Sequence, residues 1–136
     1  MKRLTLAFYR RDAVSVARDL IGCIFVHDDI EGRTAVRIVE NEAYRGVLDP
    51  GSHGYRGVTQ RTEVMYGPPG RLYVYFTYGM HWCANVVCAR SGECEAVLLR
   101  AGEPVRVSSS CALAGRQQPR TRVWRLGRRA SRRRWA

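Results

Sequence analysis

The sequence predicts a single domain that combines a helix with five β-strands. The chain has 136 residues, a usual size for one domain and enough to bury about two-thirds of its unfolded surface. One segment repeats apolar residues at helical spacing, and five later segments are rich in the β-branched or aromatic residues that favour strands. No apolar run approaches the ~20 residues that cross a membrane, and charges interrupt the N-terminal segment where a signal peptide is apolar. We therefore expect a cytoplasmic protein.

The helix is expected in the segment AVSVARDLIG, residues 13–22. Asp12 precedes this segment as a typical N-cap residue, and Gly22 suits the left-handed position that ends many helices. Four apolar side chains would share its buried face: Val14, Ala17, Leu20 and Ile21. The pattern predicts one short amphipathic helix.

The strands are expected on either side of a long loop. Five segments have strand character, at residues 23–28, 33–44, 71–78, 82–89 and 94–101. The first two form a hairpin around the turn DIEG, the next two meet near Gly79, and RSGE precedes the fifth. The loop, residues 45–70, is rich in Gly and Pro, with one helical turn expected around TEVMY. Loops of this length inside a domain are often functional.

The positive charge is concentrated at the C-terminal end. The formal net charge is +11, yet residues 1–104 hold thirteen basic and twelve acidic side chains, whereas residues 105–136 hold ten arginines and no acid. We therefore divide the chain into part of a folded domain at residues 1–104 and an Arg-rich tail at residues 105–136. Three origins of the tail stay open: a disordered segment, a nucleic-acid-binding arm, or a shifted reading frame.

The five cysteines do not form a recognisable framework. Their number is odd and no Cys-x-x-Cys pair occurs, which argues against disulfides and structural zinc. A zinc site would have to use the cluster His81, Cys83, Cys88 and Cys94. Cys83 and Cys88 are an odd number of residues apart, so on one regular strand they face opposite sides. We expect reduced, buried cysteines and neither a metal nor another cofactor.

Two carboxylates in the segment VENEAY are candidates for chemistry. Glu40, Glu42 and Tyr44 are spaced by two residues, so on a strand they point to one face with the carboxylates ~7 Å apart. Paired carboxylates suit a general acid or base. The alternatives are a solvent-facing strand edge and a glycoside hydrolase that uses both carboxylates.

The aromatic stretch GRLYVYFTYGMHWCANVV has two interpretations. The plain one is a half-buried strand, with Val74 and Phe76 packed inward. Tyr73 and Tyr75 would then lie on the other face. The sharper interpretation is a platform on which nucleobases stack, with Tyr78 at the strand end as a wedge between base pairs.

The long loop holds a lone histidine, His53. A lone histidine is more often structural than catalytic. Tyr55, Arg56 and Arg61 follow in the same loop, and together these side chains could contact a polar, flat or anionic ligand.

Four segments, taken in order, resemble a known family. IVENEAYRG, DPGSHGYRG, MYGPPGRLYVYFTYGMHWCANVV and AVLLRAGEPV closely resemble the alkyladenine (3-methylpurine) DNA glycosylases in their bacterial form, from about Leu4 to Val105. The resemblance implies an α+β fold with a curved, mostly antiparallel, barrel-like sheet and flanking helices. It also implies a repair enzyme that hydrolyses the N-glycosyl bond of an alkylated purine. The family continues for about as many residues again, so we expect an incomplete fold with uncovered apolar surface.

The resemblance implies a role for each matching residue. Glu42 matches the general base that activates a water, and Arg100 matches the arginine that helps to hold this water and a neighbouring phosphate. Tyr44 and Tyr75 match the rings on either side of the extruded base. His53 matches the pocket histidine that contacts the sugar-phosphate and the base.

The same resemblance extends to the DNA. Tyr78 matches the residue inserted into the minor groove, Asn85 matches the residue that disfavours guanine, and Arg56 and Arg61 are expected to contact phosphates. The expected partner is double-stranded DNA with a damaged purine, bound by a monomer. Because Lys2 is the single lysine, we expect hydrolysis without strand cleavage, which would need an amine nucleophile. The alternative is an inactive remnant that binds DNA through its basic tail.

Overall fold

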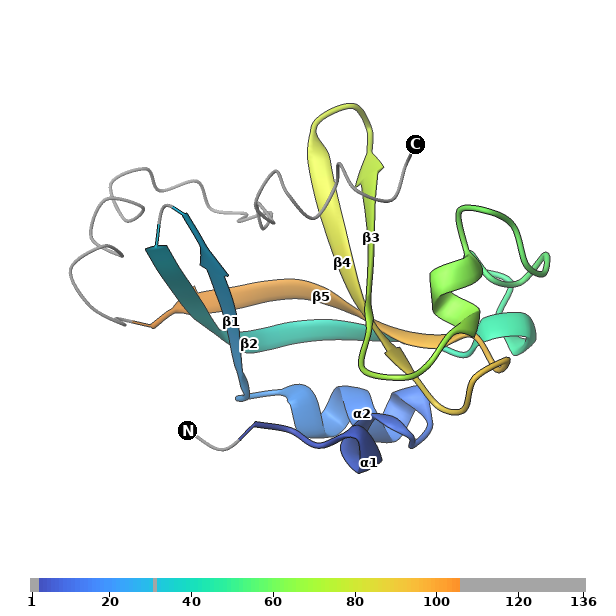
Figure 1. Ribbon diagram of the computed structural model, residues 1–136, viewed down its shortest axis with the longest axis horizontal. Helices are drawn as coiled ribbons and strands as arrows, with labels where there is room; N and C mark the ends of the chain where they lie inside the picture. Colours follow the sequence, from blue (N-terminus) through green and yellow to red (C-terminus); the bar gives the residue numbers. More distant parts are fainter. Residues whose placement is uncertain (1–2, 31, 106–136) are drawn as a thin grey trace.

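A curled antiparallel sheet forms the body of the fold, with two helices against one side (Figure 1). This computed structural model describes residues 3–30 and 32–105, so the expected Arg-rich tail lies outside the described residues apart from Val105. The helical elements are α1 (Leu6–Tyr9), α2 (Ala13–Leu20) and the 3-10 turns η1 (Gly46–Leu48) and η2 (Glu63–Tyr66). The strands are β1 (Ile24–Asp29), β2 (Gly32–Tyr44), β3 (Leu72–Thr77), β4 (His81–Cys88) and β5 (Glu95–Pro104). The predicted α+β fold and its strands are confirmed.

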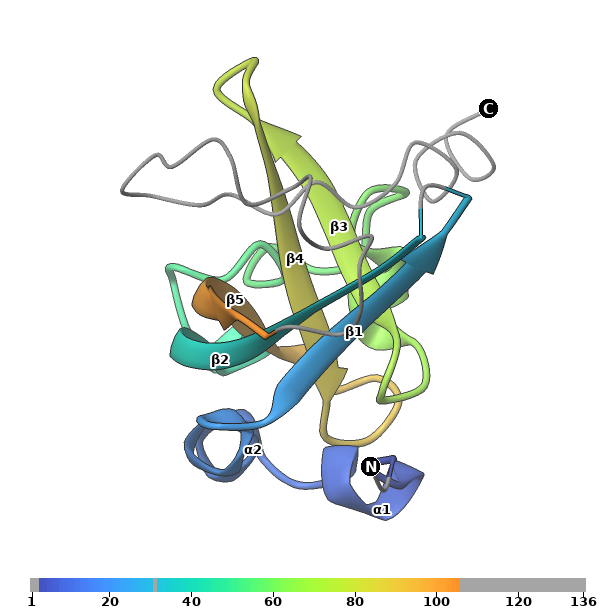
Figure 2. The ribbon, with the colours of Figure 1, turned by 90° about the vertical axis from the view of Figure 1, so that its left-hand side faces the viewer.

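The strand order is β1-β2-β5-β4-β3, and every neighbouring pair is antiparallel. The two sequential hairpins, β1–β2 and β3–β4, therefore lie on the outside, with β5 between them. Irregular pairing of β2 with β5 near Glu40 marks bulges, which bend a strand and increase its twist. Both hairpins project away from the helices (Figure 1 and Figure 2).

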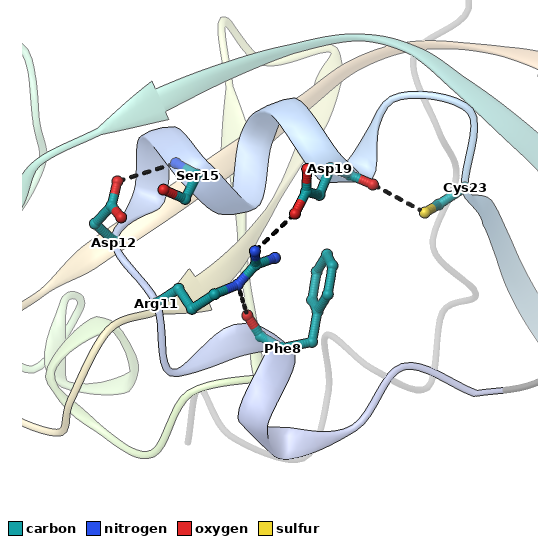
Figure 3. Close-up of polar contacts among 6 residues, drawn as sticks. All are labelled: Phe8, Arg11, Asp12, Ser15, Asp19 and Cys23. Atoms are coloured by element: carbon teal, nitrogen blue, oxygen red, sulfur yellow. Dashed lines mark hydrogen bonds and ion pairs between the residues drawn. The ribbon is translucent and has the colours of Figure 1, made fainter.

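Helix α2 begins at the predicted N-cap. One carboxylate oxygen of Asp12, Oδ1, accepts a hydrogen bond from the backbone N–H of Ser15 at 2.9 Å (Figure 3). Gly22 follows the helix end with φ at +83°, as a C′ glycine does. Arg11 joins α1 to α2, because its Nε donates to the Phe8 carbonyl at 3.0 Å and its Nη1 pairs with Asp19 at 2.6 Å (Figure 3).

The buried face of α2 differs from the predicted one. The prediction is wrong for Val14 and Ile21, which are 38% and 50% exposed. The side chains that α2 buries are Ala13, Val16, Ala17 and Leu20. They follow the i, i+3, i+4, i+7 spacing of one helical stripe, which includes two small alanines and leaves the more apolar Val14 and Ile21 outside.

The two faces of the sheet bury different clusters. The helix-face cluster consists of Ala13, Val16, Ala17, Leu20, Ile38, Val86, Cys88, Val97 and Leu99. The loop-face cluster consists of Met65, Tyr73, Val87, Cys94 and Ala96. Consecutive residues such as Val86 and Val87 fall in different clusters because strand side chains alternate between faces. Cys88 belongs to the helix-face cluster, whereas Cys94, in the turn before β5, belongs to the loop-face cluster.

The loop of residues 45–70 is held against the loop face. At Gly46, φ is +58° and a Cβ would lie 2.5 Å from the Glu93 carbonyl oxygen, so this position requires glycine. A Cβ at Gly54 would overlap the sulfur of Cys94. The Tyr66 hydroxyl donates to the Gly54 carbonyl at 2.6 Å. The predicted helical turn is present as η2, and the loop is tied to the sheet at several points.

The outer part of the β3–β4 hairpin is less buried than the sequence predicts. Phe76, expected to pack inward, is 48% exposed, and its ring lies 4.9 Å from that of Trp82. The prediction is wrong because the hairpin extends past the helices, which cover only the other end of the sheet (Figure 1). Among residues 3–30 and 32–105, no cluster of His, Cys, Asp and Glu could hold a metal ion, and no helix is long and apolar enough to cross a membrane.

Candidate functional site

One row of residues crosses the loop face of the sheet through four strands. Glu42 of β2 pairs with Leu98 of β5, Leu98 pairs with Asn85 of β4, and Asn85 pairs with Tyr73 of β3. Paired residues of neighbouring strands point to the same face. The row spans three strand spacings of ~4.8 Å each, measured along the curled sheet. The row forms a floor with a carboxylate at one end and an aromatic ring at the other.

The carboxylate of Glu42 is held from two sides. Its Oε2 accepts a hydrogen bond from the Tyr44 hydroxyl at 2.7 Å, and its Oε1 lies 3.3 Å from Nε of Arg100. The same Nε lies 3.8 Å from Glu40, so one guanidinium serves both carboxylates. The side chains of Glu42 and Arg100 are 41% and 50% exposed, which leaves them accessible to water and to a ligand.

The Tyr44 hydroxyl stays protonated and therefore remains a hydrogen-bond donor to this carboxylate. The hydrogen bond to Glu42, followed by partial burial and the carboxylate charge, raises the pKa of Tyr44 to about 12. Its hydroxyl therefore keeps its proton throughout the neutral range. A fixed donor on Oε2 holds the orientation of the Glu42 side chain and leaves the other lone pairs for a water.

An aromatic and basic group lies at the other end of the row. The His53 ring contacts Tyr75 at 4.6 Å between centroids and Tyr73 at 5.9 Å, both edge to face. Nδ1 of His53 lies 3.1 Å from the Tyr73 hydroxyl oxygen. The same oxygen accepts a hydrogen bond from Nε of Arg61 at 3.2 Å. The Arg61 guanidinium lies over the Tyr75 ring at 5.2 Å. We call His53, Arg61, Tyr73 and Tyr75 the aromatic cluster.

Burial changes the titration of this cluster. Desolvation, followed by the nearby Arg61 charge, lowers the pKa of His53, although part of the ring stays in contact with solvent. Desolvation, followed by interaction with Cys83, raises the pKa of Tyr75, and Tyr44 is close enough to add to the rise. Desolvation also raises the pKa of Tyr73, against a smaller opposing effect of Arg61. At neutral pH the cluster therefore offers a neutral imidazole and neutral phenols.

Asn85 lies between the two ends of the site. It is 5% exposed, and its amide Nδ2 donates to the backbone carbonyl of Tyr73 at 3.3 Å. This cross-strand bond fixes the side chain as part of the floor. Asn85 is thereby a fixed and largely buried part of the row between Glu42 and Tyr73.

Tyr78 lies apart from the other candidates, just beyond the end of β3 at the tip of the β3–β4 hairpin. It is 88% exposed, with φ at +51°, in the left-handed region that a non-glycine residue seldom adopts. Met80, 68% exposed, lies at the same tip. The hairpin therefore presents a large ring at its outermost point. Arg56 is exposed in the loop near His53.

The structure brings most of the predicted residues onto one face. Glu42, Tyr44 and Arg100 are in direct contact, and His53, Tyr75 and Arg61 form a second group. Sequence reasoning missed Tyr73: alternation placed it on the face opposite Val74 and Phe76, and the family resemblance gave it no role in the site. Its ring is packed, at 2% exposed, yet its hydroxyl joins His53 to Arg61. The hydroxyl of Tyr73 was the signal that could have identified this residue, because a buried tyrosine ring needs a polar partner for its hydroxyl.

Comparison with known proteins identifies the family. The family model described as Methylpurine-DNA glycosylase (MPG) matches residues 7–128, well over half of the chain. The chain belongs to this family. The match runs past the boundary at residue 104 into the Arg-rich tail, so similarity to the family does not stop where the charge pattern changes.

Curated relatives support the same assignment. A protein of Leifsonia xyli is 54% identical over 121 residues, which cover 85% of this chain and 55% of the relative. One of Methanoculleus marisnigri is 58% identical over 103 residues, 75% of this chain and 52% of the relative. One of Streptomyces avermitilis is 54% identical over 100 residues, 74% of this chain and 47% of the relative. Each is named, provisionally, as a 3-methyladenine DNA glycosylase. The chain spans about half the length of these relatives.

Proposed function

We propose that this chain carries the catalytic and base-binding groups of a DNA repair glycosylase that excises alkylated purines of the 3-methyladenine type. The observation that carries the proposal is the loop face itself, where a row of paired residues links a carboxylate held by a phenol and a guanidinium to a cluster of aromatic rings. Family membership and the names of the relatives support the same activity.

Access to the base is the first step of this function. A base inside a duplex is out of reach of a carboxylate, so it must be extruded at a cost of a few kcal/mol. Tyr78, at the tip of the projecting hairpin, would fill the space that the base leaves. A damaged or mispaired purine costs less to extrude, which contributes to selectivity.

Binding of the extruded base is the second step. An alkylated purine is cationic, and electron-rich tyrosine faces attract cations and stack on flat rings. Tyr44 and Tyr75 would provide these faces, and their raised pKa values keep both hydroxyl groups protonated, so that the rings stay uncharged. His53 would contact the sugar-phosphate, while Asn85, fixed by its bond to Tyr73, would restrict which purine edge fits.

Hydrolysis is the third step. Glu42 would accept a proton from a water that attacks the anomeric carbon, and its negative charge would stabilise the oxocarbenium-like sugar. Arg100, 3.3 Å from Glu42, would orient this water and hold the adjacent phosphate. The departing base needs no protonation, because an alkylated purine leaves as a neutral molecule. Because the described residues 3–30 and 32–105 include no lysine to attack the sugar, the reaction would end at an abasic site without strand cleavage.

The test is release of base from DNA by the full chain. Duplex DNA containing 3-methyladenine is expected to lose that base, while an undamaged duplex keeps its bases. The strands are expected to stay intact until the abasic product is treated with alkali. If the chain and its Glu42→Gln variant release equal amounts, or nothing, the proposed activity does not belong to this chain.

A second candidate function follows from the charge of the C-terminal segment. Residues 105–136 carry ten arginines and no acid, which favours binding to phosphates without sequence readout. Binding of this kind would be equal for damaged and undamaged duplexes and would weaken steeply with salt. A lesion preference that survives in high salt would contradict it as the sole function.

A further inference from the structure

We propose that Tyr73 is a positioning residue of this site, whose buried hydroxyl holds His53 with its proton on Nε2 and holds Arg61 beside it. The inference rests on the proposed function only for the role of His53 as a ligand contact. The arrangement itself is a property of the chain.

The hydrogen-bond pattern around one oxygen atom carries the argument. The Tyr73 hydroxyl has one proton to donate and can accept hydrogen bonds. Arg61 is always a donor, so its Nε–H, 3.2 Å away, takes up an acceptor position on that oxygen. The hydroxyl proton must then point elsewhere. Among the described residues, the acceptor within reach is Nδ1 of His53, 3.1 Å away.

The opposite assignment leaves a buried proton unpaired. If Nδ1 of His53 carried the proton, it would donate to Tyr73 alongside Arg61, and the hydroxyl proton would have no acceptor among residues 3–30 and 32–105. Tyr73 is 2% exposed, so water does not compensate. An unpaired buried donor is costly, which favours the assignment with Nδ1 as acceptor.

The consequence is a defined donor at the surface of the site. With Nδ1 turned to Tyr73, the Nε2–H lies on the far edge of the imidazole, and the His53 residue is accessible to solvent. A neutral imidazole in this state donates a hydrogen bond to an acceptor such as a phosphate or sugar oxygen. Arg61 adds a cation next to it, anchored by Tyr73 and by the Tyr75 ring 5.2 Å away. One buried hydroxyl thus orients two groups that would contact the DNA backbone under the proposed function.

The test is nitrogen NMR of the His53 imidazole in the full chain, with two tyrosine variants. Wild type is expected to show an unprotonated Nδ1 and a protonated Nε2 at neutral pH. Tyr73→Phe keeps the ring and removes the hydroxyl, so the share of the Nδ1–H form is expected to rise several-fold. Tyr66→Phe is the matched control, because its hydroxyl also anchors this loop, at the Gly54 carbonyl, without touching His53. It is expected to keep the wild-type spectrum.

Two results would overturn the inference. The first is a protonated Nδ1 in wild type, which needs no variant and stands even if Tyr73→Phe does not fold. The second is a tautomer ratio in Tyr73→Phe equal to that of wild type. Neither result depends on base release, so a chain without glycosylase activity still tests the positioning role. Where activity is present, Tyr73→Phe is expected to lower kcat/KM by up to about tenfold, which corresponds to the loss of one hydrogen bond. Tyr66→Phe is expected to lower kcat/KM by a smaller factor.

Discussion

The two faces of the sheet are built from the same strands and differ in almost every chemical property. On the helix face, Val86 and Val97 are sealed beneath α2. On the loop face, their neighbours Asn85 and Leu98 lie in the row that links Glu42 to Tyr73. One residue along a strand is enough to move from the apolar cluster beneath the helices to the row that holds the candidate site. We propose that the helix face mainly gives stability and that the loop face carries the functional site.

The largest expected effect tests the helix face. Leu20→Ala removes a side chain that is 3% exposed in the helix-face cluster, and it should lower the free energy of unfolding by about 2–5 kcal/mol. Val14→Ala, on the outer side of the same helix, should change it by less than about 0.5 kcal/mol. Chemical denaturation measures both. Equal losses would mean that the buried stripe of α2 is assigned to the wrong residues.

A smaller effect tests how the loop is attached to the other face. Gly54→Ala would place a methyl group against the sulfur of Cys94, and relieving the overlap should cost about 1–3 kcal/mol. Because His53 precedes Gly54, base release should fall as well. Gly51→Ala is the control in the same loop, since its methyl group would come no nearer than 3.2 Å to another atom, an oxygen of the Asp49 side chain. If Gly51→Ala proves as damaging as Gly54→Ala, the loop is not held at Cys94.

The smallest effect concerns the titration of one phenol. The pKa of Tyr44 is expected at about 12 and should fall toward its ordinary value near 10 in Glu42→Gln, because the carboxylate acceptor is lost. A raised folded-state pKa means that the stabilising contribution of Tyr44 is complete below pH 10 and disappears as the pH rises through about 12. NMR of isotope-labelled tyrosine Cζ follows this titration. If the pKa of Tyr44 is unchanged in Glu42→Gln, the Glu42 carboxylate is not the cause of its rise.

Local signals in the sequence predicted most of the fold. Alternating residues and turn-forming glycines identified the strands, and Asp12 identified the start of α2. The pairing of β2 with β5 could not be predicted from local pattern, because nothing near Glu42 specifies Leu98 as its partner. The exposure of Phe76 was missed for a related reason: whether a strand residue is covered depends on how far the helices reach.

The candidate site was predicted in part. The family resemblance pointed to Glu42, Tyr44 and Arg100, which are in contact in the structure. It did not reveal that Arg61, expected to contact phosphate, is tied by Nε to a buried hydroxyl. That contact joins residues of the loop and of β3, and such a contact is a property of the fold rather than of a motif. The roles of these residues in catalysis stay predictions.

The most direct test of the account compares two glutamates in single-turnover release of 3-methyladenine from duplex DNA. Glu42 and Glu40 both lie beside Arg100, but the Tyr44 hydroxyl orients only Glu42. Glu42→Gln should lower the rate by roughly 10²–10⁴-fold, the usual contribution of a general base, while Glu40→Gln should change it little. Equal losses in the two variants, or full activity in Glu42→Gln, would contradict the assignment of Glu42 as the general base.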